Sequence, residues 1–321
     1  MKILIVHAHH EPKSFSSALA RRAETAFQAQ GHSVDFADLY AEHFNPVSER
    51  RNFSTVKDPQ YLKQQTEEAY ATEVGGFAPD LEKEIRRLES CDLLIFSYPL
   101  WWFGMPAILK GWVDRVFAAG RIYGGPKIYE GGLGQSRRRA LVLMTTGGGP
   151  DAYGGFGVNP SLSNVLAPVQ HGVFWFNGFL PLAPFVAWSP VRITPEERAK
   201  YLDSLSERLR TTESEPPLVL PPLADFPGWG KDTKKRFMVT ATRPKPMDEI
   251  FKSHIPAEQA HLAEWRRLGL LLEFHMMPPQ AEPWRAFLLF RETDATAVQK
   301  HLATLPLAPW LEFEITELAQ V

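Results

Sequence analysis

The chain has 321 residues, of which 44% are hydrophobic and 22% are charged, and its formal net charge is −2. This length favours two domains, and the near balance of charges argues against nucleic acid or a membrane surface as partner. A single cysteine, Cys91, excludes an internal disulfide framework and a cysteine-rich metal site, so no metal is predicted. Without an apolar run of about 18 residues, we expect no transmembrane helix, and without a signal peptide we expect a cytoplasmic protein.

The first two thirds of the chain alternate apolar runs with amphipathic stretches. The apolar runs predict strands at 3–6, 34–36, 92–97, 140–145 and 178–186. The amphipathic stretches predict helices at 16–30, 81–88, 106–117 and 195–210, the last with Thr194 as its N-cap. A long segment of mixed character separates the second strand from the second helix, at 40–77. This alternation is typical of a doubly wound α/β fold with a parallel sheet.

A proline-rich stretch follows and divides the chain. Residues 1–212 are predicted to form the first domain, 213–233 an extended linker, and 234–321 a second domain. In the second domain, strands are expected at 236–242, 271–276, 284–290 and 311–316, and helices at 256–269 and 295–304. The resulting order, βαββαβ, predicts a small α+β domain of the ferredoxin-like type.

Three loops follow predicted strands of the first domain, where an open α/β sheet binds its ligands. The first runs from His9 to Ser16 and opens a helix. Its hydroxyl residues and free N–H groups suit a pyrophosphate, and Lys13 and His9 add donors and charge. An ordinary capped helix explains the same residues equally well. The loop lacks the glycine pattern of a dinucleotide-binding Rossmann turn.

The second loop, from Pro99 to Pro106, contains three consecutive aromatic residues, Trp101, Trp102 and Phe103. A loop cannot bury all three, and exposing them is costly. A rigid apolar wall for a planar ligand is therefore the better interpretation.

The third loop follows Thr145 and contains Thr146, Gly147, Gly148 and, further along, Tyr153. Glycines allow close approach of the backbone to a ligand, and the N–H groups together with the tyrosine hydroxyl can stabilise negative charge. A flexible turn without a ligand remains the simpler reading of this loop by itself.

With these residues in view, residues 1 to about 210 resemble the FAD-dependent NAD(P)H:quinone reductases of the DT-diaphorase family, within the flavodoxin-like superfamily. The resemblance rests on an ordered series of short matches. They are Ala8-His9, Ser14-Phe15, Asp38-Leu39-Tyr40, Phe44-Asn45-Pro46, Pro99-Leu100, Trp102-Phe103-Gly104, the run from Pro106 to Trp112, Arg115-Val116-Phe117 and the run from Thr145 to Gly148.

The resemblance implies FAD as cofactor, because the segment 40–77 distinguishes the FAD-binding members from short FMN flavodoxins, and NADH or NADPH as electron donor. It also implies a homodimer with the flavin at the subunit interface. Carried over by position, the contacts with the pyrophosphate or adenosine half fall on His9, Ser14, Phe15, Ser16 and Gln60. Those with the isoalloxazine fall on Pro99, Leu100, Trp102, Phe103, Thr145, Thr146, Gly147, Gly148 and Tyr153. Trp101 is not shared with the family, but it lies in the same loop and is also expected to bind the cofactor. Tyr123 and Phe176 would line a shared nicotinamide and quinone pocket.

One position departs from the family pattern. The mammalian members carry a histidine six residues after the counterpart of Tyr153, and here that position is Asn159. A neutral amide can form hydrogen bonds but cannot carry a proton. We therefore expect hydride transfer to be retained, with Tyr153 or water as the proton source and Asn159 beside it.

Residues 235–321 resemble muconolactone isomerase, chiefly through the run from Leu305 to Ile315 and the helix end from Ala263 to Gly269. Candidate polar groups are Glu264, Trp265, His254 and His275, although a solvated helix face and a strand edge also explain them. We prefer a role in oligomerisation or substrate shielding. A second enzyme, acting on a ring-cleavage lactone, is the competing hypothesis.

Taken together, the sequence predicts two-electron reduction of quinones by NAD(P)H, through flavin N5 and by a ping-pong route. A flavin-binding redox regulator or ancillary subunit is the alternative of a different class. Reduction of nitro or azo compounds is a further possibility, because an open apolar pocket discriminates weakly between flat acceptors.

Overall fold

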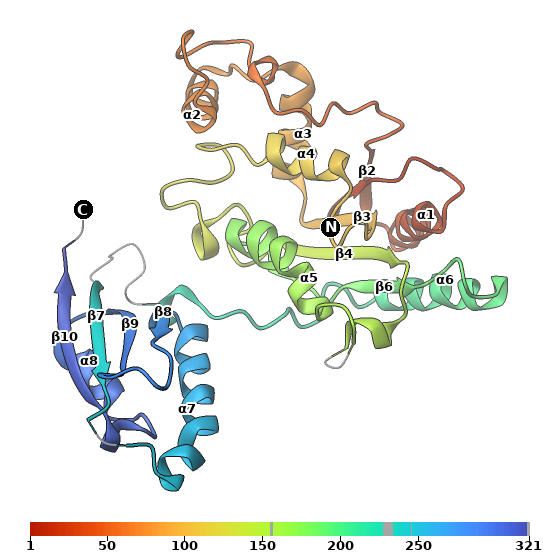
Figure 1. The fold of residues 1–321 in the computed structure, drawn as a ribbon. Helices are drawn as coiled ribbons and strands as arrows, with labels where there is room; N and C mark the ends of the chain where they lie inside the picture. The colour runs from red at the N-terminus through yellow and green to blue at the C-terminus, as the bar shows by residue number, and fades with distance from the viewer. Residues whose placement is uncertain (155–156, 227–233, 245, 320–321) are drawn as a thin grey trace. The chain divides into compact units, whose positions relative to one another are not determined.

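The computed structural model describes residues 1–154, 157–226, 234–244 and 246–319. The chain divides into two compact units, Met1–Asp225 and Phe226–Val321 (Figure 1). In the segment predicted to be a linker, the Leu218 N–H donates to the Pro181 carbonyl at 2.7 Å, which attaches residues before 226 to the first unit. The remainder of that segment, 227–233, lies outside the described residues.

The first unit is built on a parallel sheet with the strand order β2-β1-β3-β4-β5, and β6 also pairs with β4. The strands are β1 (Lys2–His7), β2 (Ser33–Asp38), β3 (Leu93–Pro99), β4 (Arg139–Thr146), β5 (Leu180–Pro181) and β6 (Phe185–Trp188). The central strands are buried almost throughout because helices cover both faces, which explains their continuous apolar runs. The predicted doubly wound α/β fold is confirmed.

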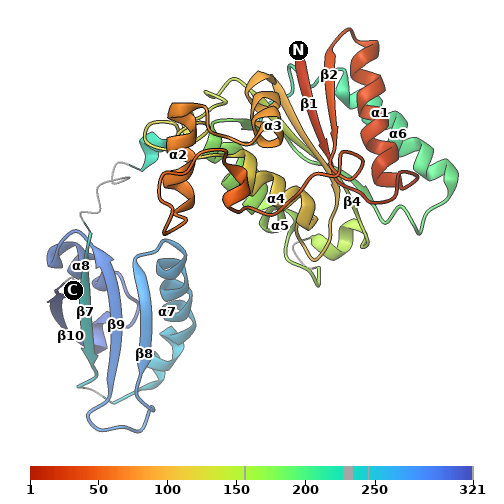
Figure 2. The same cartoon turned by 90° about the horizontal axis from the view of Figure 1, so that it is seen from above.

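Helices cover the sheet from two sides (Figures 1 and 2). On one face lie α1 (Phe15–Ala29) and α6 (Pro195–Leu209), whose apolar residues share a core with Ile5. The opposite face is covered by α3 (Pro79–Ser90), α4 (Ala107–Val116) and α5 (Leu162–Val169), whose apolar side chains form a second core. Thr194 caps α6 as predicted, within a reciprocal capping box.

The sequence-based prediction differs from the structure at three places in this unit. The mixed segment 40–77 contains a helix, α2 (Gln64–Val74), and α5 was also not anticipated. The strand predicted at 178–186 is in fact two short strands, β5 and β6. Pro181 and Pro184 explain the interruption, because proline has no N–H to donate to a sheet ladder.

The second unit has the predicted βαββαβ order. Its strands are β7 (Lys235–Thr242), β8 (Leu271–Met276), β9 (Arg285–Glu292) and β10 (Glu312–Leu318), in an antiparallel sheet of order β10-β7-β9-β8. Helices α7 (Glu249–Arg267) and α8 (Ala295–Leu302) pack on one face, as Figure 2 shows. The prediction began α7 seven residues late at Pro256, but Asp248 caps the helix by accepting the Phe251 N–H at 2.6 Å.

Within the described ranges, no helix combines the length and apolarity needed to cross a bilayer.

Candidate active site

The strand order places one edge of the sheet at the centre of the candidate site. The chain moves from β1 outward to β2 and then returns to β3 on the other side of β1, so the order reverses between β1 and β3. Ligands of doubly wound sheets bind beyond the carboxyl ends of the strands at such a point. The three loops singled out in the sequence follow β1, β3 and β4 and therefore share this edge.

The first loop is held by a chain of polar contacts that starts inside the sheet. The His7 ring, 1% exposed, contacts Ser97 Oγ at 3.1 Å and Ser17 Oγ at 3.0 Å. Ser14 is the N-cap of α1, and its Oγ accepts the Ser17 N–H at 3.1 Å. The first turn of α1 therefore faces this edge, and the N–H groups of Phe15 and Ser16 have no acceptor among the described residues.

Two hydrogen bonds join the loops to each other. Ser16 Oγ lies 2.7 Å from Thr145 Oγ1, which connects the start of α1 with the end of β4. The Leu100 N–H donates to the Thr145 carbonyl at 2.8 Å, which fixes the beginning of the aromatic loop. Thr145 is thus the common anchor of all three loops.

His9 does not supply the positive charge expected for a pyrophosphate site. Burial and the neighbouring His10 lower the pKa of His9 below its usual value, so the neutral ring is favoured at physiological pH. Its Nδ1 accepts the Glu11 N–H at 2.9 Å, which leaves Nε2 as the donor. His9 can therefore hold a ligand oxygen by a hydrogen bond rather than by charge.

The aromatic loop is a tight turn. Trp101 and Gly104 exchange two backbone hydrogen bonds of 3.1 and 2.9 Å, and the two residues between them, Trp102 and Phe103, have φ values of 51° and 57°. A positive φ is costly for bulky residues and is commonly retained at functional sites. The turn leaves Trp102 97% exposed and Phe103 47% exposed.

Trp101 behaves differently from its two neighbours. It is half-buried, and its ring packs against the rings of His9 and His10 at centroid distances of 5.8 and 5.6 Å. Trp101 therefore joins the second loop to the first, whereas Trp102 and Phe103 remain available to a ligand.

The glycine loop brings Tyr153 beside the aromatic turn. Tyr153 is 9% exposed, and its ring lies 6.3 Å from Phe103 and 5.5 Å from Trp188, measured between centroids. A side chain at Gly147 would meet open space, whereas one at Gly148 would come within 3.2 Å of the Tyr153 ring. The N–H groups of these two glycines have no acceptor among the described residues, so they remain free for a ligand.

Asn159 is linked to this loop through its backbone. Its N–H donates to the carbonyl of Ala152 at 2.9 Å, next to Tyr153 in the chain. Within the described part of the chain, the Asn159 side chain forms no hydrogen bond with the Tyr153 hydroxyl.

Tyr123 and Phe176 are assembled as a separate group. Their rings lie 6.0 Å apart, and the Tyr123 hydroxyl accepts from Gln65 Nε2 at 3.1 Å. Both line a cleft of about 560 Å³. Among the described residues, neither ring contacts Phe103 or Tyr153.

Gln60 lies outside the three loops. It is exposed, and its N–H donates to the side chain of Asp58 at 2.8 Å. The loop itself is fixed by the buried Glu67, which accepts the N–H groups of Lys57 and Asp58 at 2.8 Å each. No contact among the described residues brings the Gln60 side chain to the three-loop site.

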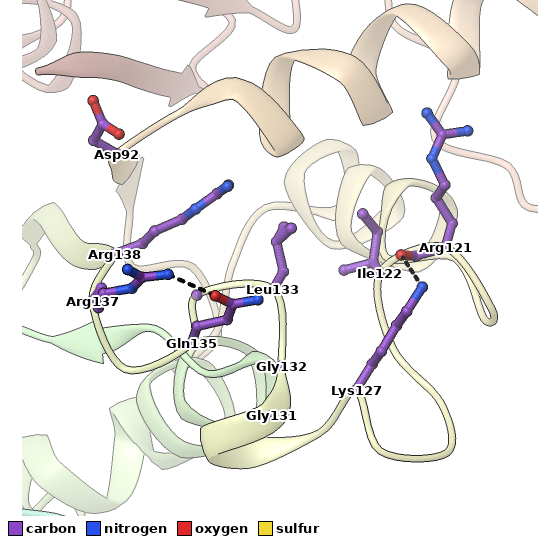
Figure 3. A pocket seen from close by; sticks show the side chains of 11 residues that line it. Asp92, Arg121, Ile122, Lys127, Gly131, Gly132, Leu133, Gln135, Arg137 and Arg138 are labelled. Atoms are coloured by element: carbon purple, nitrogen blue, oxygen red, sulfur yellow. Dashed lines mark hydrogen bonds between the residues drawn. The ribbon is translucent and has the colours of Figure 1, made fainter.

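A second, basic cleft lies elsewhere on this unit (Figure 3). Its volume is about 520 Å³, and Asp92 and Arg138 line it at the chain entries to β3 and β4. Its cations already have partners: Arg121 pairs with Glu89 at 2.6 Å, and Arg138 donates to the Glu89 carbonyl at 2.7 Å. Because it lies at the amino-terminal edge of the sheet, it is separate from the candidate site of the three loops.

Several residues of the site were not anticipated from the sequence. Trp188 packs on Tyr153, and Ser189 Oγ donates to the Gly147 carbonyl at 3.1 Å. Both lie at or just after the end of β6, a strand that the prediction merged with β5. His7 was also overlooked, although a histidine at the end of an apolar strand was the signal available.

Comparisons with known proteins identify the family of each part of the chain. Residues 1–210 match a family described as having a flavodoxin-like fold, and residues 236–321 match muconolactone delta-isomerase. The chain is 38% identical over 218 residues to ribosyldihydronicotinamide dehydrogenase [quinone] of Pongo abelii, with 68% of this chain and 94% of that protein covered. It is 37% identical over 226 residues to NAD(P)H dehydrogenase [quinone] 1 of Rattus norvegicus, with 70% and 82% covered.

A solved structure of a candidate quinone reductase from Klebsiella pneumoniae superposes with a TM-score of 0.66 at 32% identity, covering 69% of this chain and 88% of that one. The chain therefore belongs to the flavodoxin-like NAD(P)H:quinone oxidoreductase family and carries, in residues 236–321, a muconolactone isomerase-like domain.

Proposed function

We propose that this protein reduces quinones to hydroquinones by two electrons, with NADH or NADPH as donor and FAD as the bound flavin. The observation that carries the proposal is the meeting of three loops at the switch point of the sheet, where an exposed aromatic turn lies beside Tyr153 and the glycine loop, with open space at Gly147. The quinone reductases to which the chain is similar support the substrate class.

The residues at this edge fit a flavin. Trp102 and Phe103 offer a flat apolar wall, and the free N–H groups of Gly147 and Gly148 offer donors for a polar ring edge. The start of α1 suits a pyrophosphate, because the N–H groups of Phe15 and Ser16 have no acceptor among the described residues. A bound flavin supplies the relay of one hydride, from the nicotinamide to the quinone in successive half-reactions.

Proton delivery is assigned to Tyr153 or to water. The Tyr153 ring is held between Phe103 and Trp188, which fixes the direction of its hydroxyl. The side chain of Asn159 cannot exchange a proton at physiological pH. Asn159 instead helps to hold the loop through its hydrogen bond to Ala152.

A homodimer is part of the proposal. The family resemblance assigns Tyr123 and Phe176 to the same pocket as the flavin ring, yet in one chain their cleft has no ring contact with the Phe103–Tyr153 pair among the described residues. A second copy that places its cleft opposite the aromatic turn would bring Tyr123 and Phe176 into the same pocket as the flavin ring, as the resemblance implies. The second copy would also cover Trp102. Light scattering of the purified protein tests this, and a monomer at micromolar concentration would refute it.

The activity is tested with the purified protein. We expect a yellow protein whose extracted flavin is FAD, and parallel double-reciprocal lines when benzoquinone and NADH or NADPH are varied together. Ribosyldihydronicotinamide is a useful third donor, because one relative is named for it. A colourless protein that binds neither FAD nor FMN and oxidises no nicotinamide would refute the proposal.

The role of Tyr153 is tested by Tyr153→Phe, with Asn159→Ala as the matched control on the same loop. Loss of the hydroxyl is expected to lower kcat/KM for the quinone by roughly tenfold to a hundredfold, since water replaces it only in part. Asn159→Ala is expected to change it by no more than about threefold, because the amide carries no proton. Equal losses in the two variants would contradict this assignment.

The same measurements separate the alternatives. Rapid turnover with benzoquinone in the absence of any partner protein would argue against a redox regulator or ancillary subunit. A parallel screen with nitro- and azo-aromatic acceptors would show whether the site prefers quinones.

A further inference from the structure

The second unit contains a partly open cavity of about 250 Å³ between α7 and the sheet. All of its lining residues fall between Ala241 and Phe313. The walls are almost wholly apolar, and several are aromatic, among them Phe251, Phe274 and Trp284. The cavity is smaller than the roughly 300–1,000 Å³ of drug-sized ligand pockets, so its size suits a molecule of one or two rings.

One carboxyl group lies in this apolar lining. Glu258 is on α7 and is only 8% exposed, and burial raises its pKa above the usual value. Its Oε2 accepts the Leu307 N–H at 3.0 Å. Among the described residues, Oε1 has no hydrogen-bond partner, so Glu258 retains an acceptor that can serve a ligand. Oε1 is not one of the fully buried, unpartnered side-chain atoms of the described residues, so it remains accessible to water or to a ligand.

The other charged residue in the described lining is Arg243. Its guanidinium lies 5.1 Å from the ring centre of Trp284 and 5.9 Å from that of Phe251, and it donates to the Pro279 carbonyl at 3.2 Å. Arg243 is thus committed to the aromatic wall, and no ion pair among the described residues joins it to Glu258.

The four candidate polar groups that the sequence suggested for the second unit lie outside the cavity lining. Glu264 is exposed and pairs with Arg267 at 2.6 Å, and Trp265 is part of the core below α7. His275 is exposed beside Glu273, and His254 packs on Trp310. None of these residues lines the cavity.

We propose that this cavity binds a small phenol, namely the hydroquinone that the first unit produces, with the phenolic O–H donating to Glu258. Aromatic walls suit a flat ring, and a carboxylate acceptor distinguishes a hydroquinone, which carries O–H donors, from a quinone, which carries only carbonyl acceptors. The identity of the hydroquinone as ligand rests on the proposed function of the first unit, whereas phenol binding does not.

The test uses the full-length holoprotein with [¹³C-methyl]methionine, because Met247 and Met276 line the cavity while Met105 and Met144 belong to the first unit. Naphthol is the probe, since it has the required ring and hydroxyl, and naphthalene is the matched ligand without the hydroxyl. We expect naphthol to shift the Met247 and Met276 signals saturably, and to bind more tightly than naphthalene.

Glu258→Gln keeps an acceptor for Leu307 but removes the charge, and Glu264→Gln is the control on the exposed face of the same helix. We expect Glu258→Gln to weaken naphthol binding by about tenfold or more, and to leave naphthalene binding unchanged. Ala286→Leu, which fills the cavity from β9, should abolish both. Absence of shifts at Met247 and Met276, or equal naphthol affinity in wild type and Glu258→Gln, would overturn the proposal.

The link to the first unit is measured separately. Benzohydroquinone, added anaerobically without nicotinamide, should displace naphthol from the cavity, and failure to compete would overturn the identity of the ligand. Quinone reduction by Glu258→Gln should equal that of wild type, because Glu258 is outside the flavodoxin-like unit. If naphthol binds but no variant, wild type included, reduces quinones, then the proposed function fails while the phenol site stands.

Discussion

His7 offers a prediction whose size follows from the structure. Its ring is 1% exposed at the end of β1, between Ser97 and Ser17. Burial lowers the pKa of His7 from 6.5 to about 4 in the folded protein. Between these two pH values the unfolded chain binds a proton that the folded chain excludes, so stability falls as the pH falls through this window. At 1.36 kcal/mol per pH unit, the loss is about 3 kcal/mol in total.

The assay compares wild type with His7→Gln. The substitution lowers stability at every pH because it disturbs both serine contacts, but it should also remove the dependence contributed by His7. For each protein, the change in the free energy of unfolding between pH 6.5 and pH 4 is measured. Wild type is expected to lose about 3 kcal/mol more than His7→Gln over this range. His171→Gln, an exposed histidine of the same unit, is the matched control.

Cys91 provides the readout for the first unit alone. It is the single cysteine of the chain and is 2% exposed, so its reaction with a dipyridyl disulfide in increasing urea reports unfolding of this unit. If wild type and His7→Gln lose stability in parallel as the pH falls, then His7 takes up its proton in the folded state. The argument from burial would then be refuted.

Three further outcomes are expected. Trp102→Ala should change the free energy of unfolding by less than about 0.5 kcal/mol, because the side chain is 97% exposed. It should nevertheless weaken flavin retention, and unchanged retention in a dialysis assay would count against the aromatic wall. Gly111→Ala should lower the free energy of unfolding by about 1–3 kcal/mol in a urea titration, because its Cβ would lie 2.2 Å from the Pro46 carbonyl oxygen. Gly172→Ala, with open space around it, should not destabilise the protein, and equal effects of the two substitutions would contradict the packing. The thiol of Cys91, whose pKa burial raises to about 12, should resist iodoacetamide in native protein at pH 8, and rapid labelling would show that the site opens.

Much of the first unit could be predicted from local patterns. The apolar runs of β1, β3 and β4 are long and uninterrupted, and the structure buries them between two helical layers. The prediction failed where local patterns were weak: α2 lies in a polar segment, and the prolines between β5 and β6 interrupt an otherwise apolar run. The order βαββαβ of the second unit was recognisable, although α7 begins before an internal Pro256 that reads as a helix start.

The sequence by itself determined the fold class, the family and the three loops of the candidate site, because these depend on short-range periodicity and on contiguous motifs. The tertiary structure decided which residues of those loops meet: Ser16 contacts Thr145 across 129 positions, and Trp188 reaches Tyr153 from another strand. The tertiary structure also shows that the carboxyl group of α7 that lines a cavity belongs to Glu258, whereas Glu264, the candidate from the sequence, pairs with Arg267. Both glutamates are on one helix, and only the packing of α7 against the sheet decides that one faces solvent while the other faces a cavity.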